Sequence, residues 1–161
     1  MREILFRGKR IDNGEWVMAG NLIHFNPEGG ELHYYIPKIK AKCVCTHDGS
    51  GNILAIEEGT FYKVVPETVG QFTGLTDKNG KRIFEGDIIK IPDDYNEFGH
   101  NAGESYEVYF AYGGFRLKPK YSKARGYWLE DDNTVEVIGN IHDNPELIGE
   151  RKDNENRKLE D

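Results

Sequence analysis

Polar and apolar residues alternate along most of this chain with a period of two. Between residues 38 and 45, one set of alternate positions holds lysines and the other holds apolar residues. The first set is Lys38, Lys40 and Lys42, and the second is Ile39, Ala41, Cys43 and Cys45. Because successive side chains of a β-strand point to opposite faces, this stretch is predicted to be a strand with one solvated face. Turn residues separate such runs at short intervals, which is typical of an all-β protein.

Two Asn-Gly pairs divide the alternating runs into hairpins. Residues 3–11 lead into Asn13-Gly14 and residues 16–23 return, while residues 69–75 and 81–84 flank Asn79-Gly80. An Asn-Gly pair supplies the two positive-φ positions that a tight hairpin turn requires. Further strands are expected at 88–91, 106–110, 115–117, 127–129 and 134–141. Asn144 is expected to cap one helical turn that begins at Pro145.

These elements predict a mainly β fold in which antiparallel hairpins pack on an SH3-like or partly open β-barrel. The N-terminal hairpin subdomain is expected to span residues 1–66, and the barrel subdomain residues 67–149. Residues 92–104 are polar and predict a loop of a length that is uncommon in compact domains. Residues 150–161 carry nine charged side chains and one apolar one, Leu159. This charged tail cannot bury enough surface to offset its ordering entropy.

Composition and charge narrow the class of protein. A chain of 161 residues is long enough to build a core without metal or disulfides. Its net charge of -7 argues against wholesale coating by nucleic acid but permits a local basic patch. No apolar run approaches the roughly 20 residues that cross a bilayer, and the N-terminus lacks the apolar stretch of a signal peptide. We therefore expect a cytoplasmic protein of a bacterial host with no membrane partner.

One segment, residues 115–128, reverses the overall sign of the chain. It carries five positive charges and no negative one, with aromatic residues interleaved. Cations that hold phosphates, with flat rings on which bases stack, are what a single-stranded nucleic-acid site needs. The candidate residues are Arg116, Lys118, Lys120, Tyr121, Lys123, Arg125 and Trp128. The alternative is a hairpin whose rings face the core and whose charges keep a strand edge soluble.

The cysteines raise the question of a metal site, because Cys43, Cys45 and His47 share one face of a predicted strand. Structural zinc takes four ligands and prefers at least two residues between its cysteines. The remaining histidines are scattered along the chain. Buried thiols also behave as small hydrophobes. We therefore expect reduced cysteines, no metal site and no other cofactor.

Three stretches of sequence carry a family resemblance. They are Met1–Arg7 (MREILFR), Gly74–Lys90 (GLTDKNGKRIFEGDIIK) and Val137–Leu147 (VIGNIHDNPEL). In order and separation they closely resemble the YopX protein family of phages and prophages, with only the charged tail outside. The resemblance implies a predominantly β fold and a phage or prophage origin in a bacterial cytoplasm. It implies no activity, because the family has no established catalytic residues.

Turn chemistry offers a physical reason for the second and third stretches. Gly80 and Gly86 suit positions where the backbone turns with positive φ. Asp87 can accept hydrogen bonds from nearby backbone N–H groups and so fix its turn. Asn144 and Pro145 suit the start of a helical turn. We interpret both stretches as architectural.

No catalytic motif accompanies these features. Neither a GxSxG nor an HExxH sequence occurs, and the glycines of residues 74–80 have the wrong spacing for a phosphate-binding loop. We expect a phage-derived accessory protein that is not an enzyme. One hypothesis is a module that binds a host or phage protein or self-associates into a homo-oligomer. The other is a nucleic-acid-binding module that uses the basic segment.

Overall fold

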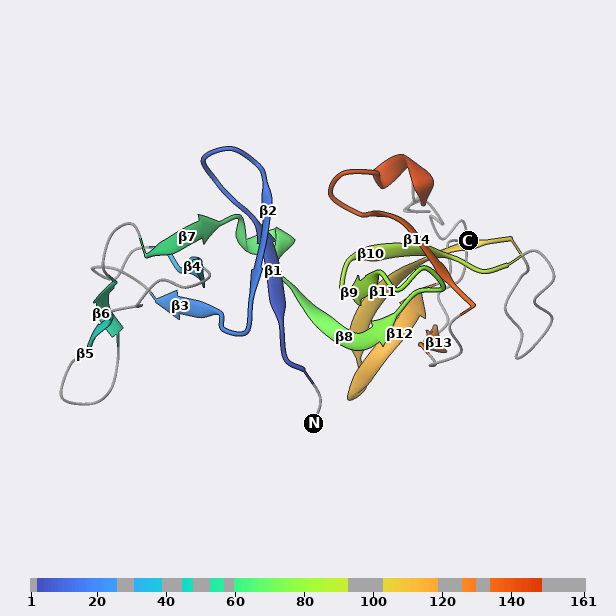
Figure 1. Cartoon of the computed structure of the whole chain (residues 1–161), viewed down its shortest axis with the longest axis horizontal. Helices are drawn as coiled ribbons and strands as arrows, with labels where there is room; N and C mark the ends of the chain where they lie inside the picture. The colour runs from blue at the N-terminus through green and yellow to red at the C-terminus, as the bar shows by residue number, and fades with distance from the viewer. Residues whose placement is uncertain are drawn as a thin grey trace, which may run out of the picture. The chain divides into compact units, whose positions relative to one another are not determined.

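The computed structural model describes residues 3–25, 31–38, 45–47, 53–56, 60–92, 103–118, 126–129 and 134–148. These residues form antiparallel strands and two short turns of 3-10 helix (Figure 1). The prediction of a mainly β fold is therefore confirmed. No sheet formed by these residues closes into a barrel, so SH3-like packing stays a prediction. The chain divides into two compact units.

The first unit comprises residues 1–76 and 82–85. Its elements are β1 (Phe6–Lys9), β2 (Trp16–Ala19), β3 (Ile23–Phe25), β4 (His33–Pro37), β5 (Cys45–His47), β6 (Ile53–Ile56), β7 (Phe61–Val64), η2 (Pro66–Thr68), β8 (Gly70–Thr76) and β9 (Arg82–Phe84). The strands form one sheet in the order β2-β1-β8-β9, a second in the order β3-β4-β7, and the pair β5-β6. This unit extends past residue 66, where the sequence predicts the end of the first subdomain.

Apolar side chains from the two larger sheets form the core of the first unit. They are Ile36, Phe61, Val64, Phe72, Ile83 and Phe84. Strands β1 and β7 approach closely at Gly8, because a Cβ built there would lie 3.0 Å from the Cβ of Val64. An isolated bridge between Arg10 and Val64 continues this contact toward the β1–β2 turn. Because Gly8 has no side chain, the two sheets can approach each other at this point.

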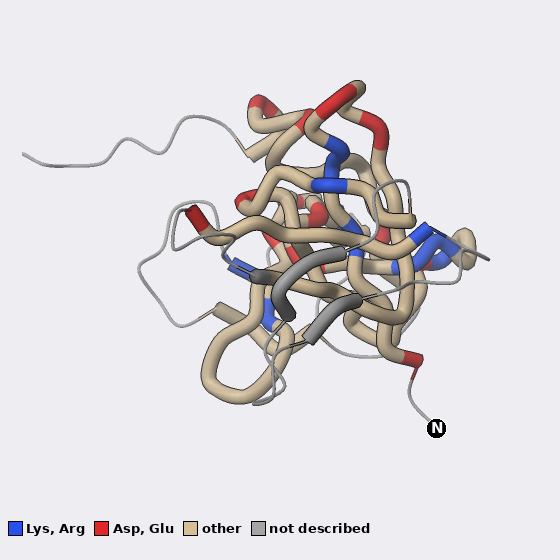
Figure 2. The backbone as a smooth tube through the Cα atoms, turned by 90° about the vertical axis from the view of Figure 1, so that its left-hand side faces the viewer, with Lys and Arg blue, Asp and Glu red and all other residues tan. Residues whose placement is uncertain are grey.

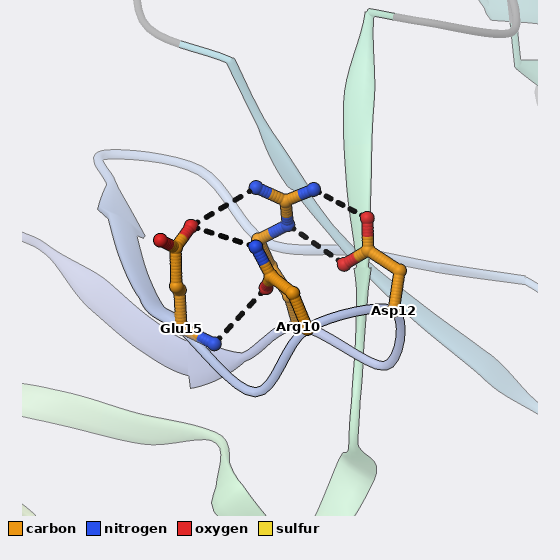
Figure 3. Close-up of polar contacts among 4 residues, drawn as sticks. Arg10, Asp12 and Glu15 are labelled. Carbon is orange, nitrogen blue, oxygen red and sulfur yellow. Dashed lines mark hydrogen bonds and ion pairs between the residues drawn. The ribbon is translucent and has the colours of Figure 1, made fainter.

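The β1–β2 turn is organised by Arg10 (Figure 3). The Arg10 guanidinium pairs with Asp12 on one side and with Glu15, at 3.3 Å, on the other. Asn13 donates to the Glu15 carboxylate at 2.8 Å and accepts from the Glu15 backbone N–H at 3.0 Å. The hydrogen bond from Arg10 is the main reason that the pKa of Asp12 is lowered. The hairpin predicted here is confirmed.

The second unit comprises residues 77–81 and 86–161. Its elements are β10 (Asp87–Lys90), β11 (Ser105–Ala111), β12 (Gly114–Lys118), β13 (Tyr127–Trp128), β14 (Glu136–Asn140) and η3 (Pro145–Leu147). The strands form one antiparallel sheet in the order β13-β12-β11-β10-β14, in which β11 and β12 are a long hairpin (Figure 1). Its buried apolar side chains are Ile88, Ile89, Ile91, Tyr106, Val108, Leu117, Val135 and Val137.

Residues 77–81 cover the outer edge of β14 within this unit. Asp77, only 3% exposed, accepts hydrogen bonds from the backbone N–H groups of Asn79 at 2.8 Å, Lys81 at 2.9 Å and Val137 at 3.1 Å. Lys78 N–H donates to the Val135 carbonyl at 3.0 Å. An uncovered edge strand would offer these groups to other chains. This turn, which lies within the second family stretch, therefore protects an edge of the sheet.

The third family stretch forms the turn after β14. Asn140 accepts from the backbone N–H groups of His142 and Asp143, at 3.0 and 2.9 Å. The helical turn at Pro145 forms as predicted, but the Asn144 side chain makes no capping hydrogen bond. It turns back instead and accepts from Asn140 N–H at 3.4 Å. Asn144 therefore occupies the predicted N-cap position, but its side chain does not supply the hydrogen bond of a cap.

The glycines of the predicted turns behave only partly as expected. Gly14, Gly80 and Gly86 have φ values of 73°, 78° and 81°, which confirms their left-handed conformations. Asn13 and Asn79 are not at positive φ, so each hairpin uses one left-handed residue, not the two predicted. The loops are longer than a two-residue turn: Arg10 N–H donates to the Glu15 carbonyl across the first. Longer hairpin loops built around a type I turn need only one such residue.

Several predictions fall on residues outside the described ranges. They concern Lys40 and Lys42 of the lysine-bearing strand, most of the loop 92–104, and the charged tail. Cys43 also lies outside these ranges. Figure 2 shows basic and acidic residues interspersed along the described backbone. Ion pairs such as Lys78–Glu136, at 2.6 Å, are consistent with this mixture.

Candidate functional site

One face of strands β11, β12 and β13 gathers rings and cations. In the antiparallel register Arg116 lies opposite Tyr109 on one side and Trp128 on the other, while Lys118 lies opposite Glu107. Directly opposed residues share a face of the sheet. Tyr112, in the turn between β11 and β12, has its ring centroid 5.7 Å from the Arg116 guanidinium carbon. We call this set the stacked face, and its members are Tyr109, Tyr112, Gly114, Arg116, Lys118 and Trp128.

The indole of Trp128 lies against strand β12. A Cβ built at Gly114 would be 2.5 Å from the indole Cζ3, so only glycine leaves room for the ring there. The guanidinium carbon of Arg116 is 4.2 Å from the ring centroid, within cation–π range. Trp128 is nevertheless 51% exposed. One side of the ring is therefore held by the protein while much of the residue faces solvent.

Arg116 is the most enclosed cation of this face. It is only 9% exposed, and its Nη2 donates to the carbonyl of Gly126 at 3.0 Å. Its guanidinium lies within cation–π range of both Tyr112 and Trp128. The structure thus surrounds the guanidinium of this candidate residue with protein groups, among them the Trp128 ring.

Lys118 is more open. Its Nζ lies 3.7 Å from the Glu107 carboxylate and 5.8 Å from the centroid of the Tyr109 ring. The Lys118 side chain keeps 37% of its surface exposed. The Glu107 side chain is less open, with 14% of its surface exposed. Lys118 is therefore the more accessible member of this ion pair.

The tip of the hairpin carries backbone strain. Tyr112 has φ of 53° and Gly113 has φ of 83°, so the two-residue turn has both central residues in the left-handed region. Among the described residues, Tyr112 is the one non-glycine residue at positive φ. A left-handed conformation costs an L-residue about 1–2 kcal/mol. Asn or Gly would form this turn with less strain, yet the position holds a tyrosine that is 68% exposed.

The opposite face of the same hairpin mostly enters the core. Tyr127 packs edge-on against buried Tyr106, with ring centroids 6.0 Å apart. Phe110 and Phe115 form a similar pair at 5.2 Å near the tip, where Phe110 is 52% exposed. Two of the aromatics in the basic segment therefore serve the core side. Trp128 is on the outer side.

Part of this arrangement was predicted from the sequence. The structure brings Arg116, Lys118 and Trp128 together, whereas Lys120, Tyr121, Lys123 and Arg125 lie outside the described residues. Tyr109 and Tyr112 were missed, because the charge pattern begins only at residue 115. The Tyr112-Gly113-Gly114 sequence was the available signal, since two glycines beside an aromatic residue predict a turn with an exposed ring.

Neither a metal-ligand cluster nor a membrane-spanning helix is found among the described residues. They contain no group of three His, Cys, Asp or Glu side chains that could hold a metal ion. Of the predicted metal candidates, Cys45 and His47 lie in β5, and Cys43 is outside the described ranges. In the same part of the chain, no helix has the length and apolar character needed to span a bilayer.

Comparisons with known proteins identify one family and one similar solved structure. The profile of a family described as YopX protein matches residues 5–149. A solved structure, the crystal structure of protein EF1440 from Enterococcus faecalis, is 26% identical, and the match covers 90% of this chain and 97% of that one with a TM-score of 0.50. No curated protein matches. The likeness therefore extends over almost the whole length of both chains.

Proposed function

The chain belongs to the YopX protein family, and from this and its stacked face we propose that it is a phage- or prophage-derived accessory protein that binds single-stranded nucleic acid without catalysing a reaction. The observation that carries the proposal is Trp128. Its ring lies against β12 at Gly114 with half of the residue exposed, and the exposed Tyr112 lies near the same Arg116 guanidinium. Bases of any sequence can stack on such rings.

The charge of the basic segment also favours single-stranded nucleic acid as the ligand. Residues 115–128 contain five cations and no anion within a chain of net charge -7. A polyanion is attracted to such a segment, while the acidic remainder disfavours coating of the whole protein. Lys118 lies beside the Tyr109 ring with 37% of its side chain exposed. We propose that Lys118 contacts phosphate, together with Lys120, Lys123 and Arg125 of the same segment.

Fluorescence anisotropy with labelled oligonucleotides of about ten nucleotides tests the proposal. We expect affinity to fall as salt rises, with a slope of log K against log salt near -0.7 per phosphate contact. Trp128→Ala should weaken binding by about 1–3 kcal/mol, the range for one base–aromatic stack. Phe110→Ala removes an equally exposed ring from the opposite face and should leave binding unchanged. Absence of binding at low salt, or equal losses in the two variants, would refute the proposal.

A second candidate, self-association or docking on a host or phage protein, is favoured by Phe110. This ring is 52% exposed and pairs with Phe115 at the end of the core-facing side of the hairpin. Aromatic residues of this kind are enriched at protein interfaces. Light scattering across a concentration series would detect a homo-oligomer, and Phe110→Ala should cause this oligomer to dissociate. A monomer at every concentration, with no partner protein bound, would exclude this candidate.

A further inference from the structure

Arg116 differs from Lys118, the other cation of the basic segment among the described residues. A residue that binds phosphate must present its charged group to solvent, but Arg116 is 9% exposed and its Nη2 already donates to the Gly126 carbonyl at 3.0 Å. Its guanidinium carbon lies 4.2 Å from the Trp128 ring centroid. The Arg116 guanidinium is therefore positioned to contact the Trp128 ring and not a bound ligand.

We propose that Arg116 is a positioning residue that, with Gly114, holds the Trp128 indole against strand β12 and presents its outer side for stacking. The nucleic-acid part of this inference rests on the proposed function. Gly114 supplies the space for the ring, since a Cβ there would lie 2.5 Å from Cζ3. Arg116 supplies the attraction, and its hydrogen bond to Gly126 fixes the guanidinium beneath the ring. The side chain makes no phosphate contact.

This assignment has a consequence for salt dependence. Each cation that neutralises a phosphate of a single strand adds about 0.7 to the slope of log K against log salt. A positioning residue adds nothing to that slope, although its loss weakens stacking. The two roles therefore separate in one titration series.

The binding test uses Arg116→Met, which retains an apolar stem but removes the cation and the hydrogen bond. With the oligonucleotides used above, we expect affinity about 5- to 150-fold weaker, equivalent to one base stack, with the slope unchanged. Lys118→Met is the matched comparison and should lower the slope by about 0.7. A slope reduced by about 0.7 in Arg116→Met would make Arg116 a phosphate contact and overturn the inference.

A second measurement needs no ligand. The chain has two tryptophans, so Trp16→Phe leaves Trp128 as the fluorescent reporter. In that background we expect acrylamide to quench Trp128 more strongly after Arg116→Met or Gly114→Ala than in the parent. Gly20→Ala is the control, because a Cβ there would meet its nearest atom at an ordinary 3.6 Å. Circular dichroism confirms that each variant is folded.

The two measurements separate the inference from the proposed function. Quenching that stays at the parental value in folded Arg116→Met overturns the positioning role, whether or not nucleic acid binds. Stronger quenching in a protein that binds no oligonucleotide supports the positioning role and refutes only the nucleic-acid function.

Discussion

The guanidinium of Arg7 donates a hydrogen bond from Nη2 to the backbone oxygen of Glu85, 3.1 Å away and 78 residues later in the chain. Its central carbon lies 4.7 Å from the Trp16 ring centroid and 4.9 Å from that of Phe84. The first family stretch ends with Arg7, and the second contains Phe84 and Glu85. The contact therefore gives a physical reason for these two stretches to occur together.

Replacing Arg7 should destabilise the first unit. Arg7→Met keeps the apolar stem but removes the charged donor to the Glu85 carbonyl and the cation between two rings. A hydrogen bond to a charged group contributes about 1.5–3 kcal/mol, so we expect a loss of about 2 kcal/mol in urea unfolding followed by circular dichroism. Lys9→Met is the control, because the Lys9 ammonium lies farther from the same Trp16 ring, at 5.8 Å. Similar losses in the two variants would contradict the role given to Arg7.

Asp77 links the second family stretch to the third through its hydrogen bond from Val137 N–H. We expect this carboxylate to make the stability of the second unit depend on pH. Burial alone would raise its pKa, but hydrogen bonds from the backbone N–H groups of Val137, Lys81 and Asn79 lower it below the ordinary value of 3.8. A carboxyl group with a lowered folded-state pKa adds stability above its unfolded pKa and loses it as pH falls through the folded value. The second unit should therefore lose stability below about pH 4.

The variant Asp77→Asn tests the role of this carboxylate, with stability measured at neutral pH and in acid. Its amide places an NH₂ group where a carboxylate oxygen accepts from a backbone N–H, so we expect a loss of about 1–3 kcal/mol at pH 7. The acid-induced loss seen in the parent between pH 5 and about pH 2 should become smaller. Asp12 also has a lowered pKa, but its side chain is 65% exposed beside Arg10. Because salt screens exposed pairs, only the effect of Asp77 should persist at high salt. An unchanged acid profile in Asp77→Asn would rule out this residue as the cause.

How much the sequence predicts is clear from particular residues. Gly80 and Gly86 were predictable because local turn chemistry determines their conformation. The strands of the second unit were predictable because alternation is a local pattern. The role of Arg116 was not, because it depends on which strand lies beside β12. The partner of Arg7 lies 78 residues away, and no local pattern specifies such a contact.

The strained tip of the β11–β12 hairpin yields a stabilising substitution. Asn suits the left-handed conformation of residue 112 better than tyrosine. Tyr112→Asn should therefore gain up to about 1 kcal/mol in thermal unfolding of the second unit, less any cation–π contribution of about 0.5 kcal/mol that is lost with the ring. Tyr112→Ala is the control, since it removes the same ring without relieving the strain and should destabilise. Tyr112→Asn that is no more stable than Tyr112→Ala would show that the turn is not strained.

Gly139, in the third family stretch, has no space for a side chain. A Cβ there would lie 2.6 Å from Oδ1 of Asn144 and 2.8 Å from Cδ1 of Leu147. Gly139→Ala must displace one of these groups, and overpacking of this kind costs about 1–3 kcal/mol. Removing the Asn144 side chain opens space at its nearest contact, so Gly139→Ala should be less destabilising in an Asn144→Gly background than alone. A double-mutant cycle from urea unfolding measures this coupling, which we expect to exceed about 0.5 kcal/mol. Additive losses would mean that the turn after β14 shifts freely, and that packing against Asn144 is not the reason for glycine at this position.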